Sequence, residues 1–409
     1  MRLPAELWQN ILERAIFVPK FFDTDPMETY GPIYDLLRSD RLEYWASERL
    51  RNRLRRVCQD WNVFLKRFDH RFVDIADVIN GVIPTEALPS ALRIYLSVGR
   101  CKDEPHSPTP SSMCLCRLLN YDPILKIPNN GANATLTPWK LRIIEFSPVR
   151  STISDFLWER YRISNLKSII YPTPSSLISA SNLQAQPTVI WSSMVDLPET
   201  VARSTTFFSM LTTLRLTLDA KTCPLPLHLP SLRYLFVSLP FPGRVARLVA
   251  WLKVIGYQLT ALFCEGDLSE RFSQRIWEVC PSIEVLQLSS SVFWTPPPRG
   301  HPIHTLQLEP QQDNLRKRVC DECGRIHAVI LQLSASMGEY AASGIHTIAC
   351  SGPWPTARAS SGWMGYTGYI GNLFCLKRQA QRHGIRFVDR DWISFEDYVV
   401  SQLEMGQPI

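Results

Sequence analysis

The sequence lacks an apolar run that is long enough to cross a membrane. Its longest uncharged stretch, residues 168–195, is interrupted by prolines and serines, whereas a spanning helix needs about 20 mostly apolar residues. A secretion signal is missing as well, because Glu6 and Glu13 stand where a signal peptide needs an apolar core. We therefore expect neither a membrane partner nor secretion.

A strong excess of one charge is also missing. The net charge is only +6, from 44 Lys and Arg against 38 Asp and Glu, and this small value does not indicate a nucleic-acid partner. The 11 cysteines are odd in number and irregularly spaced, so they indicate reduced thiols rather than a disulfide framework. Together these features predict an intracellular protein, either cytoplasmic or nuclear.

Common catalytic signatures are absent from the chain. It contains no Gly-rich phosphate loop that ends in Lys-Ser or Lys-Thr, no Gly-x-Ser-x-Gly and no His-Glu-x-x-His. We therefore expect no enzymatic activity and no cofactor.

Two sets of residues are of the types that bind metal ions. Cys320 and Cys323 have the two-residue gap that lets two thiolates reach one zinc ion, and His327 follows them, but a second such pair is missing. His304, His327 and His346 take the same position in three copies of the repeat described below, so strands about 4.8 Å apart would stack them. Plain reduced cysteines and a hydrogen-bonded histidine ladder are the favoured interpretations, with zinc or another soft divalent ion as the alternative. No metal site is therefore predicted.

The first 75 residues predict a small module of amphipathic helices. Apolar residues recur at helical spacing in two segments, and Pro4 suits the first turn of the first one. The first segment contains Leu3, Leu7, Trp8, Ile11, Leu12 and Ala15, and the second contains Leu50, Leu54, Val57, Cys58, Trp61 and Leu65. Residues 76–140, which include stretches rich in Pro, Ser and Asn, predict an irregular connecting region with loops.

From residue 141 onward the chain repeats itself. A template of apolar residues at positions one, four and six recurs at intervals of 19 to 27 residues, apart from one of 45 that contains Val189–Trp191 as a degenerate copy. The copies start at Leu141, Leu166, Leu211, Leu232, Leu259, Ile283, Ile303, Ile326 and Ile345. This period is typical of leucine-rich repeats, in which each copy contributes one strand and a returning helix or loop.

Helix-compatible spacers support this interpretation, at residues 154–161, 245–255, 269–279 and 373–382. We predict an α/β solenoid over residues 141–409, with parallel strands on the concave face and helices and loops on the convex face. An ordinary α/β globule is the alternative.

The N-terminal module resembles the F-box. The motif Leu3-Pro4-x-Glu6-Leu7-Trp8-x-x-Ile11-Leu12, followed by Val57-Cys58-x-x-Trp61, is similar to that of divergent fungal, basidiomycete-type F-box-like proteins with C-terminal leucine-rich repeats. Here the two halves of the motif lie farther apart than in an ordinary F-box. The resemblance implies a substrate-recognition adaptor of a Skp–cullin–F-box ubiquitin ligase, and with it a cullin–RING ligase as the wider partner. The residues implied to dock on the Skp adaptor are Leu3, Pro4, Leu7, Trp8, Ile11, Leu12, Val57, Cys58 and Trp61.

A protein target is expected on the concave face of the repeats. In each copy, the residue between the last two apolar sites points outward there. Phe236 and Phe263 fall on neighbouring rungs and predict an apolar contact with the target, and Gln287 and Gln307 continue the row. A loop that covers the two rings is the alternative for this patch. At the level of function, the alternative is a stand-alone binding scaffold whose N-terminal helices only cap the solenoid.

Overall fold

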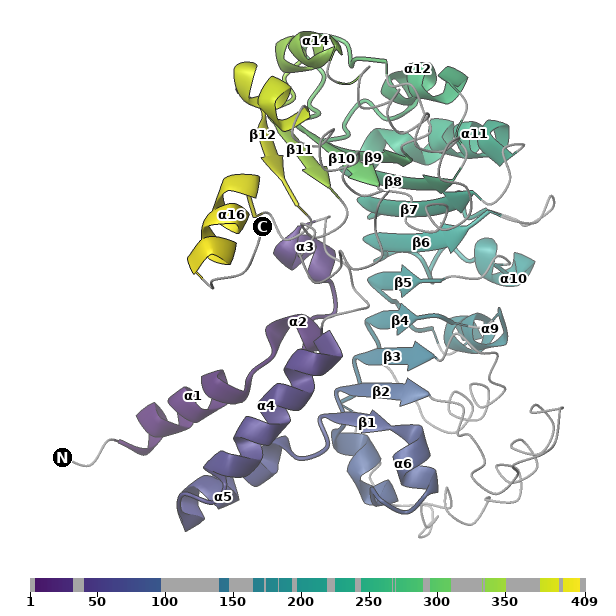
Figure 1. Cartoon of the computed structure of the whole chain (residues 1–409). Coiled ribbons are helices and arrows are strands. Elements are labelled where there is room, and N and C mark those ends of the chain that lie inside the picture. The colour runs from purple at the N-terminus through teal and green to yellow at the C-terminus, as the bar shows by residue number, and fades with distance from the viewer. Residues whose placement is uncertain are drawn as a thin grey trace, which may run out of the picture. The chain divides into compact units, whose positions relative to one another are not determined.

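The computed structural model describes the chain in segments. These are residues 4–31, 40–96, 140–146, 165–172, 174–182, 184–192, 197–218, 225–239, 244–266, 268, 270–289, 295–309, 333, 335–350, 376–389 and 393–404. The α/β class is confirmed, because the described strands form a 12-stranded sheet that follows the order of the chain from β1 to β12 (Figure 1). The observed pairings between neighbouring strands are parallel, as the solenoid prediction requires.

The chain divides into two compact units. The first comprises residues 1–29, 35–194 and 204–208, and the second comprises residues 30–34, 195–203 and 209–409. The strands of the first unit are β1 (Phe72–Asp74), β2 (Arg93–Leu96), β3 (Ile143–Phe146), β4 (Ser168–Ile170) and β5 (Val189–Trp191). Those of the second are β6 (Thr213–Thr217), β7 (Tyr234–Leu239), β8 (Ala261–Gly266), β9 (Val285–Ser289), β10 (Thr305–Glu309), β11 (Thr347–Cys350) and β12 (Arg386–Val388).

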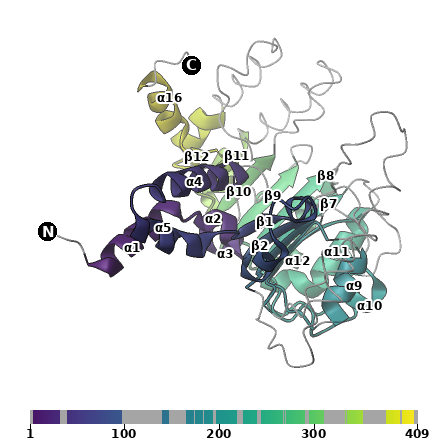
Figure 2. The same cartoon turned by 90° about the horizontal axis from the view of Figure 1, so that it is seen from below.

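Helices and helical turns connect these strands and precede them. In chain order they are α1 (Ala5–Ile16), α2 (Pro19–Phe22), α3 (Pro26–Tyr30), α4 (Asp40–Leu54), α5 (Gln59–Leu65), η1 (Lys66–Phe68), α6 (Ile75–Ile79), η2 (Thr85–Ser90), α9 (Pro174–Asn182), α10 (Glu199–Ala202), α11 (Val245–Ile255), η4 (Gly256–Gln258), α12 (Glu270–Val279), α14 (Met337–Ala342) and α16 (Phe395–Glu404). Helices α11 and α12 match two of the predicted spacers and lie side by side next to strands β7 to β9 (Figures 1 and 2).

The repeat template explains why the strands form where they do. Each strand from β6 to β11 begins two residues after the first apolar position of its copy, and that first position is buried, as Leu211, Leu232 and Leu259 show. Inside the strand, the other two apolar positions alternate with the outward residue, so Leu214 and Leu216 point inward on both sides of Arg215. The core is therefore a stack of aliphatic side chains, each of which contributes about 1.5–3 kcal/mol when it is fully buried.

The array differs from its prediction at three places. It starts before residue 141, because β1 and β2 already pair in parallel, and it continues past the last predicted copy with β12. The copy at Ile326 forms no rung between its neighbours, because β10 pairs directly with β11, with Thr305 opposite Thr347. Ile326 itself lies outside the described residues.

A glycine permits the tight packing at the end of α11. A Cβ atom on Gly256 would lie 2.1 Å from the carbonyl oxygen of Val279, at the end of α12. Even alanine would therefore collide with the backbone at the end of α12, so this position requires glycine.

The N-terminal module contains three packed helices instead of two. The predicted continuous stripe from Leu50 to Leu65 is wrong, because α4 ends at Leu54 and α5 begins at Gln59. Cys58 between them is extended, with φ −158° and ψ 169°. Leu54, at the end of α4, and Trp61, in α5, still pack against the same small core on either side of this break.

Candidate partner-binding surface on the N-terminal helices

Helices α1, α4 and α5 share a hydrophobic core of their own. Its fully buried members are Leu12, Ile16, Phe64 and Leu65, and its partly buried members are Trp8, Leu54, Trp61 and Phe68. The ring centroids of Trp8 and Trp61 lie 6.4 Å apart in a stacked pair, and Trp8 meets Phe64 edge to face at 5.4 Å. The two halves of the sequence motif are thus brought together in space, although 58 residues separate Leu3 from Trp61 in the chain.

Two apolar residues of α1, beside its inner face, are exposed. Leu7 and Ile11, one helical turn apart, are 51% and 58% exposed, and Val57 just before α5 is 61% exposed. Pro4 and Cys58 are exposed as well. The residues implied to bind the Skp adaptor therefore fall into two groups, because Leu12, Trp8 and Trp61 build the module while Leu7, Ile11 and Val57 face solvent. Leu3 lies outside the described residues.

This exposure is concentrated in the module. Eight of the sixteen exposed large apolar side chains among the described residues lie between Leu7 and Val63. They are Leu7, Ile11, Phe17, Leu42, Trp45, Leu50, Val57 and Val63. Single exposed apolar residues are ordinary on protein surfaces, but such a concentration on a few helices is typical of an interaction surface.

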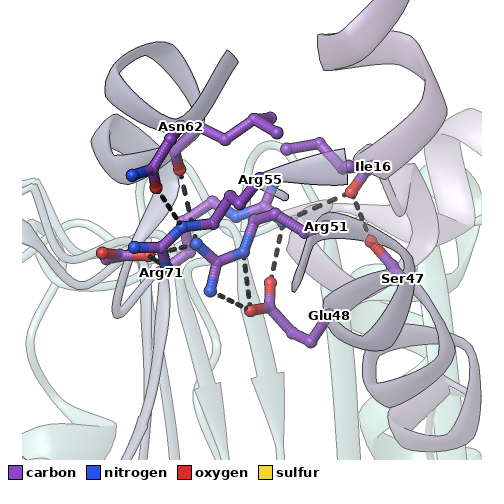
Figure 3. A network of polar contacts seen from close by, with 9 residues as sticks. Ile16, Ser47, Glu48, Arg51, Arg55, Asn62 and Arg71 are labelled. Carbon is purple, nitrogen blue, oxygen red and sulfur yellow. Dashed lines mark hydrogen bonds and ion pairs between the residues drawn. The ribbon is translucent and has the colours of Figure 1, made fainter. Parts of the chain in front are cut away.

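A buried ion-pair network holds the module together and ties it to the sheet (Figure 3). Glu48 of α4 accepts hydrogen bonds from Arg51 Nε at 2.9 Å and from Arg71 Nη2, just before β1, at 3.1 Å. Arg71 also donates to the carbonyl oxygen of Ile16 at 3.2 Å, and Ser47 donates to the same oxygen at 2.6 Å. The C-terminal end of α1 is therefore anchored to α4 and to the start of β1.

Arg51 is the centre of this network. Its guanidinium also donates to the carbonyl oxygen of Leu65 at 3.3 Å and pairs with Asp69, which Arg55 contacts at 3.2 Å. Burial by itself would lower the pKa of Arg51, but the hydrogen bonds and charges of Glu48 and Asp69 outweigh it and raise that pKa. The positive charge is thus fixed inside the helical module.

A second cluster places α2 and α4 on the outward face of β2 and β3. Glu145 of β3 pairs with Arg93 of β2 at 2.7 Å and with Arg41 of α4 at 2.5 Å. Arg93 also donates to the carbonyl oxygen of Phe21 at 2.8 Å and lies over the Phe21 ring at 4.3 Å, while Arg41 lies over the Tyr95 ring at 4.0 Å. The outward residue Glu145 therefore holds helices in place.

Sequence reasoning missed both ion clusters. Glu48 and Arg71 lie in different elements, and nothing in their spacing indicates that they meet. The available signal is on α4 alone, where Glu48 and Arg51 are three residues apart and can pair on one helix face.

The predicted target-binding residues do form one row on neighbouring strands. Phe236 of β7 pairs with Phe263 of β8, which pairs with Gln287 of β9, which pairs with Gln307 of β10. The two rings stack at 4.2 Å with 8° between their planes. All four side chains are buried, however, with Phe236 8% and Phe263 2% exposed, so the apolar target contact at these rings stays a prediction.

More accessible polar groups lie next to the stacked rings. Arg215 of β6, which takes the outward position beside Phe236, pairs across β7 with Glu265 of β8 at 3.1 Å, and both side chains are partly exposed. In the same row, the Gln307 side-chain oxygen is buried and finds no hydrogen-bond donor in the described part of the chain.

The histidine row has two described members, which stack directly. The rings of His304 and His346 lie 5.0 Å apart with 3° between their planes, because β10 and β11 are neighbours. Their Nδ1 atoms lie 2.9 Å and 3.1 Å from the hydroxyl oxygens of Thr305 and Thr347. Burial, and to a lesser extent the charge of His346, lowers the pKa of His304, against the opposing effect of Glu284.

No metal centre is found in the segments that the structure describes. No three His, Cys, Asp or Glu side chains there lie close enough to hold one ion together. Cys320, Cys323 and His327 lie outside those segments. The four described cysteines are free, and burial raises the pKa of Cys280 and Cys350 to about 12, so these two thiols stay protonated in the core.

Comparison with known proteins yields no match: no protein-family model, no curated protein and no solved structure matches this chain. None of the described helices has both the length and the apolar composition that crossing a bilayer requires.

Proposed function

We propose that this chain is a substrate-recognition adaptor of a Skp–cullin–F-box-type ubiquitin ligase. Its N-terminal helices bind the Skp adaptor, and through it the cullin–RING ligase, while its repeat surface binds a protein target. The transfer of ubiquitin is the work of the partners, so the chain itself needs no catalytic residue.

The observation that carries this proposal is the pair of exposed apolar residues on α1. The inner face of α1 is already used by the module core through Leu12 and Ile16, so Leu7 and Ile11 have no role in folding the module. Covering each of them with a partner would contribute about 1–2 kcal/mol, because roughly half of each side chain is still in water. Val57 adds a third exposed apolar group from the second half of the motif.

The test is co-purification of the full chain with a Skp adaptor. We expect the double substitution Leu7→Asp and Ile11→Asp to abolish this binding, because two carboxylates would be buried in an apolar interface. Circular dichroism and thermal unfolding should be close to those of the original chain, because both side chains are exposed.

The matched control is Val254→Asp. Val254 is also an exposed aliphatic residue on a helix, at 46% exposure on α11, but it belongs to the second unit. Binding should survive this substitution. Absence of Skp binding by the original chain would overturn the proposal.

A stand-alone scaffold is the second candidate function. The Arg41–Glu145–Arg93 cluster and the packing of Val18 and Phe21 with Phe72 favour it, because they show helices placed over the first strands as a cap would be. If the helices serve only as a cap, the chain binds a target but no Skp adaptor, and Leu7→Asp with Ile11→Asp leaves target binding unchanged.

The target contact is proposed on the outward row of the second unit. Arg215 is a partly exposed member of the row, in register with Phe236, and its ion-pair partner Glu265 lies two residues beyond Phe263 on β8. Phe263, Gln287 and Gln307 continue the row on the next strands. Because Phe236 and Phe263 are buried, a target could contact their rings only after the side chains or segments that cover them had moved.

A further inference from the structure

Helix α4 buries two charged side chains and exposes three large apolar ones, Leu42, Trp45 and Leu50. Its inner face carries Tyr44, Ser47, Glu48 and Arg51, all of them buried. Its outer face includes Leu42 at 75% and Leu50 at 38% exposure. A helix in water normally turns its apolar stripe toward the protein, so the apolar residues that α4 exposes among charged ones such as Arg49 and Arg53 are candidates for contact with a partner.

One stripe on this outer face has the spacing of a helix-pairing seam. Glu43, Ala46, Leu50 and Arg53 follow one another at i, i+3, i+7 and i+10, and all four are exposed. This is the spacing with which one helix packs along another. Ala46 is small and Leu50 is large, so an alanine on one helix leaves room for a leucine on the other.

The charges at the two ends of the stripe are opposite. Glu43 lies near the N-terminal end of α4 and Arg53 near its C-terminal end, ten residues or about 15 Å apart along the helix. Neither side chain forms an ion pair with any residue that the structure describes. An antiparallel copy of the same helix, related by a twofold axis near residue 48, would place each Glu43 opposite the second copy's Arg53.

We infer that the outer face of α4 binds a second copy of this chain. The same twofold axis sets each Ala46 opposite the second copy's Leu50, so the small and large residues match in the register that pairs the charges. The contact is self-complementary, which is the requirement for a closed twofold dimer. Its area is that of one pair of helices of 15 residues, so the dimer should be weak and depend on protein concentration.

This surface is distinct from the proposed adaptor-binding surface. The stripe lies on α4, whereas the exposed adaptor-binding residues lie on α1 and just before α5. The dimer is therefore tested without any reference to the Skp adaptor, and the double substitution at Leu7 and Ile11 should leave it unchanged.

The experiment is sedimentation equilibrium of the full chain over a range of concentrations. We expect a monomer–dimer equilibrium for the original chain. Glu43→Arg sets arginine opposite arginine at two symmetric places, and Arg53→Glu sets glutamate opposite glutamate, so each should raise the dimer dissociation constant about tenfold or more. The combination of Glu43→Arg with Arg53→Glu restores opposite charges and should restore the dissociation constant.

The control for net charge is Glu86→Arg, which makes the same charge change at an exposed residue away from the helical module. It should leave the dimer unchanged. A chain that stays monomeric at every concentration overturns the inference. The inference is also overturned if neither single substitution changes the dimer dissociation constant, or if the combined substitution fails to restore it. Thermal unfolding of each variant verifies that it is folded.

Discussion

At the scale of single residues, the stacked pair of His304 and His346 shows how the repeat register sets the chemistry of a side chain. Parallel pairing of β10 and β11 brings the two rings to 5.0 Å, and neither ring can rotate freely while its Nδ1 stays beside a threonine hydroxyl. A proton on one ring therefore opposes a proton on the other.

This arrangement predicts a pH-dependent contribution to stability. The folded pKa of His304 is lowered from 6.5, so between the folded and unfolded pKa values the unfolded chain binds more protons. The contribution is fully present above about pH 6.5 and is lost as the pH falls through the folded pKa of His304. We expect His346→Ala to raise that pKa toward its ordinary value, as measured by NMR titration of the imidazole.

His228→Ala is the control for this prediction, because His228 is exposed and belongs to another repeat. It should leave the titration of His304 unchanged. A His304 pKa that does not move in His346→Ala would show that the stacked ring contributes nothing to the shift.

At the scale of elements, α4 is held in place by a buried charge network as well as by the apolar packing of Tyr44. Glu48 forms ion pairs with two buried arginines, Arg51 on its own helix and Arg71 beside β1. A buried ion pair adds little net stability compared with apolar packing, but removal of one partner leaves the other charge uncompensated.

We therefore expect Glu48→Ala to lower the free energy of unfolding by about 3–5 kcal/mol, as measured by urea denaturation. Glu13→Ala is the matched control, since Glu13 is an exposed glutamate on α1 and its loss should change the free energy by less than about 0.5 kcal/mol. A similar small change for Glu48→Ala would mean that water solvates the two arginines and that the network is not closed.

The helices of the N-terminal module show which structural features could be predicted from the sequence. The helix at α1 is predictable from its apolar spacing, but only Trp8 and Leu12 of the predicted stripe enter the core, where Ile16 joins them, while Leu7, Ile11 and Ala15 are exposed. The predicted second helix, from Leu50 to Leu65, was too long. Leu50 and Val57 have the spacing of its apolar stripe, but in the structure both are exposed. Periodicity alone cannot distinguish an apolar residue that faces the core from one that faces a partner.

At the scale of the whole molecule, the parallel array makes each strand depend on its two neighbours. Leu235 is fully buried in β7, and its backbone is paired with β6 on one side and β8 on the other. In such arrays stability is close to a sum of terms from single repeats and from neighbouring interfaces.

A cavity in one repeat should therefore weaken nearby strands first. We expect Leu235→Ala to cost about 2–5 kcal/mol and to accelerate hydrogen exchange most in β6, β7 and β8, with smaller effects in β2 and β3 of the other unit. Leu227→Ala, at a leucine that is 64% exposed, is the control and should leave the exchange unchanged. Equal acceleration in every strand would indicate a single cooperative globule.

The order of the strands in the sheet could be predicted because apolar residues alternate with outward residues within each strand, and this pattern is visible in the local sequence. The template at Leu211, Leu232 and Leu259 determines both where a strand begins and which residues face inward, without any knowledge of distant contacts. By contrast, β1 and β2 are short strands, and β2 carries the charged outward residue Arg93, whose partners Phe21 and Glu145 lie 72 and 52 residues away in the chain.

By itself, the sequence determined the α/β repeat, the register of the outward row and the amphipathic character of α1, because these depend on spacing along the chain. Only the tertiary structure decided that Glu145 and Glu48 are buried beside arginines, that Phe236 and Phe263 are covered, and that Leu7 and Leu50 are exposed. The physical reason is that the burial of a side chain depends on the elements that pack against it in space, and residues such as Glu48 and Arg71 meet only when the chain folds.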